Sequence, residues 1–345
     1  MARLALAAHD PGGAAVLVAA APALRGRGHA LDWLPAGPAT RLWREAGEPV
    51  PDAMDATAAA ARLERDRPAL LLTGTSFHAG FERALWAAAR RLGVPSFAAL
   101  DSWSNIERRF ALSEGVPEQP DVFGVPDEST RAEITAAGWC RSRLVVIGQA
   151  HLAARTERLK RRRQGRRGGN EKRIVFFSEP IVEDFGPSAR GFTQFDVATL
   201  AAEGLAGRAG VLLSIKPHPR ESEGAWRDWL ARTPNARLAA EDTETLLGTA
   251  DGVLGMTTMV LLEARLAGIP VMSLQPGRPA PVNPIVDSLM TVIEQRQTGA
   301  AALTAWLAAF DAPPPPPRAE ELVAGGAARL VGAVEEILAG AALRA

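Results

Sequence analysis

The sequence lacks the features that would tie it to an oxidising compartment, a membrane or a polyanion. Its single cysteine, Cys140, excludes a disulfide framework and a cysteine-built metal site, and it suits a reducing compartment. The 39 Lys and Arg residues balance 39 Asp and Glu residues, so the net charge does not favour nucleic acid as a partner. No apolar run is long enough to span a bilayer. We therefore expect a cytoplasmic protein.

Patterns of metal ligands and of export signals are also lacking. His29, His78 and His151 are scattered along the chain without metal-ligand spacing, and no Asp-x-Asp loop stands out. The apolar N-terminus, MARLALAAHDPGG, runs into a glycine-rich turn instead of a cleavage site, so we interpret it as a first strand. We predict a site without a metal ion and a protein without a cofactor.

Short apolar runs alternate with amphipathic stretches through most of the chain. RLALAA, PALLLT, RIVFF and VLLSI each precede a polar or glycine-rich turn and then a helical segment. Such alternation is typical of an α/β protein whose parallel sheets are covered on both faces. With 345 residues, the chain exceeds the size at which one core usually keeps growing. We predict two Rossmann-like domains facing each other across a cleft.

The composition changes between the two halves. Residues 155–172, RTERLKRRRQGRRGGNEK, are basic and contain few large apolar side chains, which predicts a linker between domains over 1–154 and 173–345. Its charge would also allow weak contact with anionic lipid at the inner face of a membrane. Residues 313–317, PPPPP, predict a stiff polyproline II spacer. An Ala- and Leu-rich helix over 319–345 follows, which we assign to the second domain, with packing back across the domain boundary as the alternative.

The segment GMTTMVLLEARLAGIP predicts an anion site. Ligands of parallel sheets bind beyond the carboxyl ends of the strands, and here Thr257 and Thr258 open a helix directly after a strand. The free N–H groups of a helix N-terminus favour an anion, although N-capping by threonine explains the pair equally well. Glu263 lies among leucines that we expect to be buried. A carboxylate there needs a partner, and ribose hydroxyls would serve.

The segment LSIKPHPRES predicts a second wall of the same site. Pro217 and Pro219 restrict the backbone around His218, and Lys216 and Arg220 would favour nearby negative charge. A histidine that donates an N–H here would clamp a phosphate, and such charge-assisted bonds contribute about 1.5–3 kcal/mol each. The alternative is a turn histidine that only ends the strand.

These motifs resemble those of GT-B-fold glycosyltransferases. TTMVLLEARLAGIP is similar to the helix that holds the nucleotide diphosphate and ribose in their donor-binding domain. KPHP resembles the His-Pro motif of bacterial sialyltransferases, capsular Kdo transferases and CDP-glycerol glycerophosphotransferases. The resemblance implies that 173–345 binds the donor, that His218 contacts the nucleotide phosphate, and that the hydroxyl pair assists it. The first half lacks the acidic DDG-type pair of these relatives.

The turn HDPGG is the candidate for the missing base. Gly12 and Gly13 allow a tight turn and leave room for a ligand, with His9 and Asp10 at the floor of the cleft. Asp10 could take the proton from an acceptor hydroxyl. An Asx-Pro turn without any ligand is the alternative.

Other strand-end loops are candidate walls of the cleft. Trp103 offers a flat face to a sugar, or else is a half-buried side chain of a connecting loop. Glu179 and its neighbour could contact the base or sugar of the donor, or cap the next helix. The candidate residues of these loops are Ser76, Asp101, Trp103 and Asn105 in the first half and Ser178 and Glu179 in the second.

The sequence thus predicts a metal-independent glycosyltransferase. It would move a sugar or a glycerophosphate-like group from a nucleotide-activated donor to a hydroxyl of a glycan, a lipid-linked glycan or a protein, in surface polysaccharide or glycoconjugate synthesis. Lys216, His218, Thr257 and Thr258 would stabilise the leaving phosphate, and Asp10 would act as base. Two alternatives stay open: an isomerase or hydrolase similar to UDP-GlcNAc 2-epimerase, and a non-catalytic module that binds nucleotide sugars.

Overall fold

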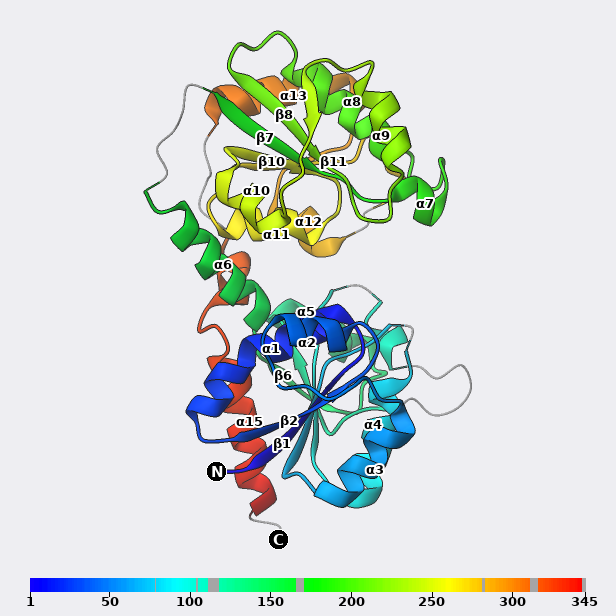
Figure 1. The fold of residues 1–345 in the computed structure, drawn as a ribbon, viewed down its shortest axis with the longest axis vertical. Coiled ribbons are helices and arrows are strands. Elements are labelled where there is room, and N and C mark those ends of the chain that lie inside the picture. Colours follow the sequence, from blue (N-terminus) through cyan, green and yellow to red (C-terminus); the bar gives the residue numbers. More distant parts are fainter. Residues whose placement is uncertain are drawn as a thin grey trace. The chain divides into compact units, whose positions relative to one another are not determined.

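The chain folds into two compact α/β units. A computed structural model describes residues 1–77, 79–103, 105–110, 118–165, 171–280, 283–310 and 316–342. The first unit comprises Met1–Ala154 and Glu321–Ala345, and the second comprises Arg155–Glu320 (Figure 1).

The first unit is built on a parallel sheet of six strands in the order β2-β1-β3-β4-β5-β6. From β1 the chain moves to one side through β2 and to the other side through β3, so the connections reverse at β1 and β3. The strands are β1 (Arg3–Ala8), β2 (Ala30–Pro35), β3 (Leu70–Thr73), β4 (Ser96–Ala99), β5 (Val122–Val125) and β6 (Arg143–Val146). The helices are α1 (Pro11–Gly26), α2 (Ala39–Glu45), α3 (Ala56–Asp66), α4 (Phe81–Leu92), α5 (Glu128–Ala137) and α15 (Ala328–Ala342), with a 3₁₀ turn over Glu107–Arg109.

Both faces of this sheet are covered, which explains the continuous apolar runs of its strands. Leu4 and Leu72 pack with Leu17 of α1 on one face. Leu71 packs with Leu85 of α4 on the other, and α3 lies beside α4 (Figure 1). Alternate residues of each strand therefore enter two separate cores.

The second unit repeats this plan with the strand order β12-β11-β10-β7-β8-β9, again all parallel. Here the connections reverse between β7 and β10. The strands are β7 (Lys172–Phe177), β8 (Val211–Lys216), β9 (Ala236–Leu238), β10 (Gly252–Gly255), β11 (Val271–Leu274) and β12 (Val292–Ile293). The helices are α6 (Ala150–Arg163), α7 (Ile181–Phe185), α8 (Gln194–Leu205), α9 (Glu223–Leu230), α10 (Thr243–Thr249), α11 (Met259–Leu266), α12 (Pro284–Leu289), α13 (Arg296–Ala309) and α14 (Pro317–Val323), of which α6 and α14 cross the limits of the unit.

The prediction of a linker over 155–172 is wrong for its first half, because α6 continues to Arg163. Leu159 of this helix is fully buried. Nη1 of Arg163 donates to the carbonyl oxygens of Leu247 and Ala250, at 2.9 and 2.7 Å, at the end of α10. Carbonyl oxygens at a helix C-terminus attract cations, so a basic segment can pack without a large apolar surface.

The C-terminal helix also departs from its predicted place. We assigned it to the second domain, but α15 belongs to the first unit, which is the alternative of packing back across the domain boundary. Its Leu330 and Val334 are fully buried against α1 and the sheet, and Nε2 of His29 lies 2.8 Å from the carboxylate of Glu335. Helical periodicity shows that a face will be buried, but not against which unit. Residues 313–315 of the predicted polyproline spacer lie outside the described residues.

In the described part of the chain, none of the helices combines the length and the apolar character that crossing a bilayer would need.

Candidate functional site

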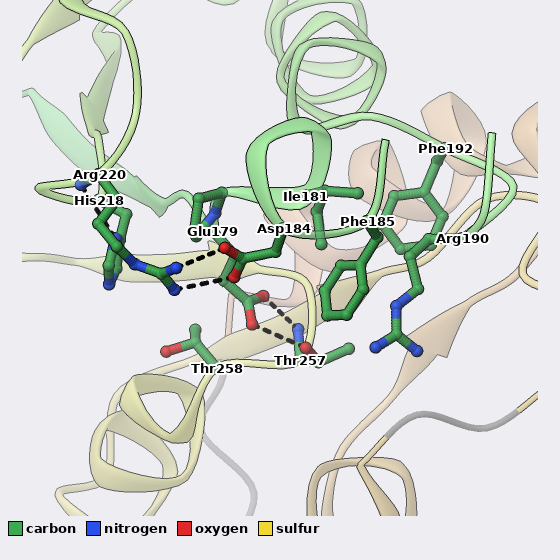
Figure 2. Close-up of a pocket in the computed structure, with 11 residues that line it drawn as sticks. Glu179, Ile181, Asp184, Phe185, Arg190, Phe192, His218, Arg220, Thr257 and Thr258 are labelled. Atoms are coloured by element: carbon green, nitrogen blue, oxygen red, sulfur yellow. Dashed lines mark hydrogen bonds and ion pairs between the residues drawn. The ribbon is translucent and has the colours of Figure 1, made fainter. Parts of the chain in front are cut away.

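A pocket lies at the carboxyl ends of β7, β8 and β10, where the connections of the second sheet reverse. This is the position at which open parallel sheets bind ligands. The cavity has a volume of about 300 Å³. Its polar walls come from the loop after β7, the loop after β8 and the start of α11 (Figure 2). The polar and charged lining residues are Glu179, Asp184, Arg190, His218, Arg220, Thr257 and Thr258.

His218 lines the pocket as a neutral N–H donor. The backbone N–H of Arg220 donates to Nδ1 of His218 over 3.2 Å, so the neutral ring carries its proton on Nε2. Partial burial, followed by the nearby charge of Arg220, lowers the pKa of His218. The imidazole therefore stays uncharged near neutral pH and offers one donor to a ligand.

Glu221, which was not among the residues predicted from the sequence, holds the loop that carries His218. One carboxylate oxygen accepts from the backbone N–H of His218, and the other accepts from Oγ of Ser178 at 2.7 Å. Burial raises the pKa of Glu221 to about 7. A glutamate three residues after the histidine, in HPRE, was the available signal, because such a side chain can reach back to a backbone N–H.

The start of α11 is already bound by a carboxylate. Glu179 accepts hydrogen bonds from the backbone N–H of Thr257 at 2.6 Å and from its hydroxyl at 2.7 Å. Burial raises the pKa of Glu179, because the charged form is poorly solvated there. The hydroxyl of Thr258 caps the helix by accepting from Val260 N at 3.3 Å. The N-capping interpretation thus holds for Thr258, and an internal anion occupies the donors of Thr257.

The cations of the pocket differ from those that we expected. Arg220 forms a two-bonded ion pair with Asp184, which neutralises its charge. Arg190, which the sequence analysis did not single out, lies with its guanidinium carbon 4.0 Å from the ring centroid of Phe185 (Figure 2). Phe185 is 48% exposed, unusual for a large apolar side chain. An exposed ring and a cation together form one edge of the pocket.

The first unit has a polar cluster at the corresponding edge of its own sheet, after β1 and β3. Nδ1 of His9 lies 2.8 Å from Oδ1 of Asp10, and Oδ2 of Asp10 accepts from the backbone N–H of Phe77 at 3.1 Å. The main chain of His9 is held as well, because its N–H donates to Glu82 at 2.8 Å. Asp10 is thus engaged on both oxygens, and it orients the imidazole of His9.

Two further carboxylates lie beside this cluster, the buried Glu82 and the partly buried Asp101. Glu82 also accepts from the hydroxyl of Ser76, and burial raises the pKa of Glu82. Asp101 accepts from Thr75 Oγ1 and from Arg109 Nη1, each at 3.0 Å. Burial raises the pKa of Asp101 despite the neighbouring guanidinium of Arg109.

Comparison with solved structures places this architecture among known folds. A UDP-GlcNAc 2-epimerase from Neisseria meningitidis, bound to UDP-GlcNAc, matches with a TM-score of 0.67 and 14% identity, covering 97% of this chain and 99% of the other. MurG from Acinetobacter baumannii matches with a TM-score of 0.53 and 14% identity, covering 97% and 99%. An Anabaena protein, HepE, in complex with UDP matches with a TM-score of 0.57 and 14% identity, covering 100% of both chains.

The chain has the GT-B fold. No family model and no curated protein matches the sequence. The GT-B architecture that the motifs resembled is therefore confirmed, and the cleft between the two domains stays a prediction.

Three predicted donor-binding residues are not among those that line the pocket. Ser178 is buried and donates to Glu221. Lys216 ends β8 but does not line the cavity. Glu263 forms an ion pair with Arg155 of α6, so a guanidinium is the partner that its buried carboxylate needs, in place of the expected ribose.

The glycines after β1 do not leave the expected room for a ligand. A Cβ atom on Gly12 would lie 1.9 Å from Oδ2 of Asp101, and one on Gly13 would lie 2.8 Å from the Cα atom of Gly74. Both glycines thus allow α1 to approach the neighbouring strand ends of the GT-B first unit closely. That space holds protein atoms, so our prediction for this pair is wrong.

The loop after β4 also differs from its predicted role. Trp103 is only 8% exposed, and its indole N–H donates to Asp127 at 2.9 Å. Asn105 has a left-handed backbone with a φ of 55°. Both residues line a separate cavity of about 300 Å³ in the first unit, together with Glu133 and Trp139. The interpretation of Trp103 as a loop side chain anchored in the protein fits best.

Proposed function

We propose that the chain is a glycosyltransferase that uses a nucleotide-activated sugar and a hydroxyl acceptor, without a metal ion, in the synthesis of surface polysaccharides or glycoconjugates. The pocket of the second unit would bind the nucleotide diphosphate of the donor. The observation that carries this proposal is that His218, as an N–H donor, and Arg190, as a cation, line one cavity at the carboxyl ends of the strands.

A diphosphate leaving group fits these donors. As the bond between the sugar and the diphosphate breaks, negative charge develops on the diphosphate oxygen. Preorganised donors at that oxygen stabilise the transition state more than the bound substrate, and this is usually the largest catalytic contribution. His218 and Arg190 would supply this stabilisation, and the exposed ring of Phe185 offers a surface for the nucleobase.

The base would be His9, with Asp10 as a positioning residue. Since Nδ1 of His9 faces the carboxylate of Asp10, its Nε2 can carry a lone pair. The acceptor oxygen would form a bond to the anomeric carbon while its proton passes to Nε2, and the electron pair of the broken bond would leave on the diphosphate. From the sequence we had proposed Asp10 as the base; here we propose His9 as the base and Asp10 as the residue that positions it.

An isomerase or hydrolase of nucleotide sugars is the second candidate. Its support is that the epimerase of Neisseria meningitidis matches this chain with a higher TM-score than MurG does, 0.67 against 0.53. An isomerase needs no acceptor, however, and the first unit has an additional cavity beside His9. This cavity favours transfer over isomerisation.

The test measures nucleotide binding and then product formation. Isothermal titration with UDP, GDP, CDP, CMP and dTDP identifies the nucleotide, and His218→Ala should lower its affinity at least tenfold with an unchanged melting temperature. The exposed Arg232→Ala is the matched control in the same unit. Unchanged affinity in His218→Ala would contradict the proposal. In a second experiment the protein is incubated with a nucleotide sugar and no acceptor, and the products are detected by NMR. An epimerised or hydrolysed sugar would favour the second candidate.

A further inference from the structure

A second large cavity lies in the first unit, next to the imidazole of His9. Its volume is about 590 Å³. It is bounded by the loop after β2, the start of α3 and the start of α4. Apart from His9 and Asp55, the described side chains that line it are apolar and belong to Ala36, Ala53, Met54, Ala56, Ala79 and Phe81.

The one carboxylate at the wall is already used. Asp55 is the N-cap of α3 and accepts from the backbone N–H of Ala58 at 2.8 Å. An N-cap carboxylate is stabilised by the helix and needs no ligand. Among the described residues that line it, the cavity therefore offers a bound molecule a mostly apolar surface, with the imidazole of His9 as its main polar contact.

Gly37 makes room for the imidazole ring of His9 at the wall of this cavity. A Cβ atom at position 37 would lie 2.5 Å from Nε2 of His9, and the φ of Gly37 is +46°, which favours glycine. The ring is held by its Nδ1 atom, which lies 2.8 Å from Oδ1 of Asp10, and the side chain of His9 is 32% exposed. Because His9 lines the cavity and is partly exposed, a hydroxyl group there could reach its imidazole.

We propose that this cavity binds the acceptor, and that the acceptor is an alcohol that carries an apolar group. The apolar group would lie against Met54 and Phe81, with its hydroxyl at Nε2 of His9. This inference rests on the proposed function, because it names the class of acceptor for the transfer. A polar glycan alone would leave the apolar wall in contact with sugar hydroxyls and gain little from it.

The chemistry of burial sets the expected size of the effect. Removing apolar surface from water stabilises a complex, and the gain grows with each methylene that is buried. An acceptor with an alkyl chain should therefore bind much more tightly than the same sugar without one. n-Octyl β-glucoside and methyl β-glucoside offer the same hydroxyls and differ only in this chain.

The experiment measures binding of these two glucosides to the full chain, without any nucleotide, by isothermal titration below the micelle concentration. We expect n-octyl β-glucoside to bind at least tenfold more tightly than methyl β-glucoside. Met54→Glu should weaken octyl glucoside binding at least tenfold, because it places a charge in the apolar wall. Thr57→Glu adds the same charge on the exposed face of α3 and should change nothing.

Two results would overturn the proposal: equal affinity for both glucosides, or unchanged octyl glucoside binding in Met54→Glu. If Met54→Glu lowers the melting temperature, Ala56→Trp fills the cavity instead and should weaken binding equally. Nucleotide titrations keep the two proposals apart. If the wild-type protein binds none of the nucleotides, the proposed function is contradicted. If it binds a nucleotide but binds both glucosides equally, only the proposed class of acceptor is contradicted.

Discussion

The carboxylate of Glu179 accepts two hydrogen bonds from Thr257, one from its backbone N–H and one from its hydroxyl, at 2.6 and 2.7 Å. These are donors that a bound phosphate would use at the start of α11. An internal anion thus competes with the ligand in the very pocket that we propose for the nucleotide diphosphate.

Glu179→Gln should therefore bind the nucleotide more tightly, by about tenfold or ~1.4 kcal/mol. The amide keeps an acceptor for Thr257 but carries no charge that would repel a phosphate. Because burial raises the pKa of Glu179, the wild-type carboxylate is protonated more readily on acidification. The difference between variant and wild type should then shrink as the pH falls. Titration calorimetry at two pH values checks this, with the exposed Glu203→Gln as control. Weaker binding in Glu179→Gln would refute competition.

Asp10→Asn should change the tautomer of His9. The carboxylate accepts from Nδ1, whereas an amide can donate to Nδ1 and move the ring proton to Nε2. Long-range ¹⁵N NMR of the imidazole reports this directly, and kcat of the transfer should fall about 100-fold or more with little change in KM. An unaltered His9 spectrum together with full activity would show that Asp10 does not position His9.

The raised pKa of Glu221 predicts that the free energy of unfolding depends on pH. Its pKa is raised from 4.5 to about 7 by burial, so the folded state binds a proton that the unfolded state has released. The stabilising contribution is full below pH 4.5 and is lost as the pH rises to about 7. The shift corresponds to at most about 3 kcal/mol, reduced by residual solvent screening. Calorimetry between pH 5.0 and 7.5 should show that the melting temperature of Glu221→Gln rises relative to that of the wild type as the pH increases. A constant difference between the two melting temperatures would contradict this prediction.

Arg155→Ala should destabilise the second unit by about 3 kcal/mol at neutral pH, because it leaves the carboxylate of Glu263 buried without its partner. The double variant Arg155→Ala, Glu263→Gln should recover most of the loss. Arg158→Ala is the matched control on the same helix. Arg158 is half exposed, and its ion pair with Glu244 is long, at 3.8 Å, so its loss should cost little. Thermal unfolding checks all three. Equal loss in the single and double variants would show that Arg155 acts through packing instead of charge.

The sequence alone was sufficient for the α/β class and for the position of the pocket. Apolar runs such as β3, LLLT, are local signals, and parallel strands bring their carboxyl ends to one edge of a sheet. His218 and Thr258, 40 residues apart, could for that reason be predicted to line one site, and they do. Secondary structure and strand direction depend mainly on residues that are close together in the chain, so they can be predicted from the sequence.

Only the tertiary structure decided which polar groups are free. Glu263 pairs with Arg155, 108 residues away, and Asp10 is held by His9 and the distant backbone of Phe77. Burial creates the need for a partner, but many cations and donors could meet that need, and periodicity does not choose among them. The same holds for α15, whose apolar face could have packed on either unit. Long-range pairing is settled by the geometry of the whole fold.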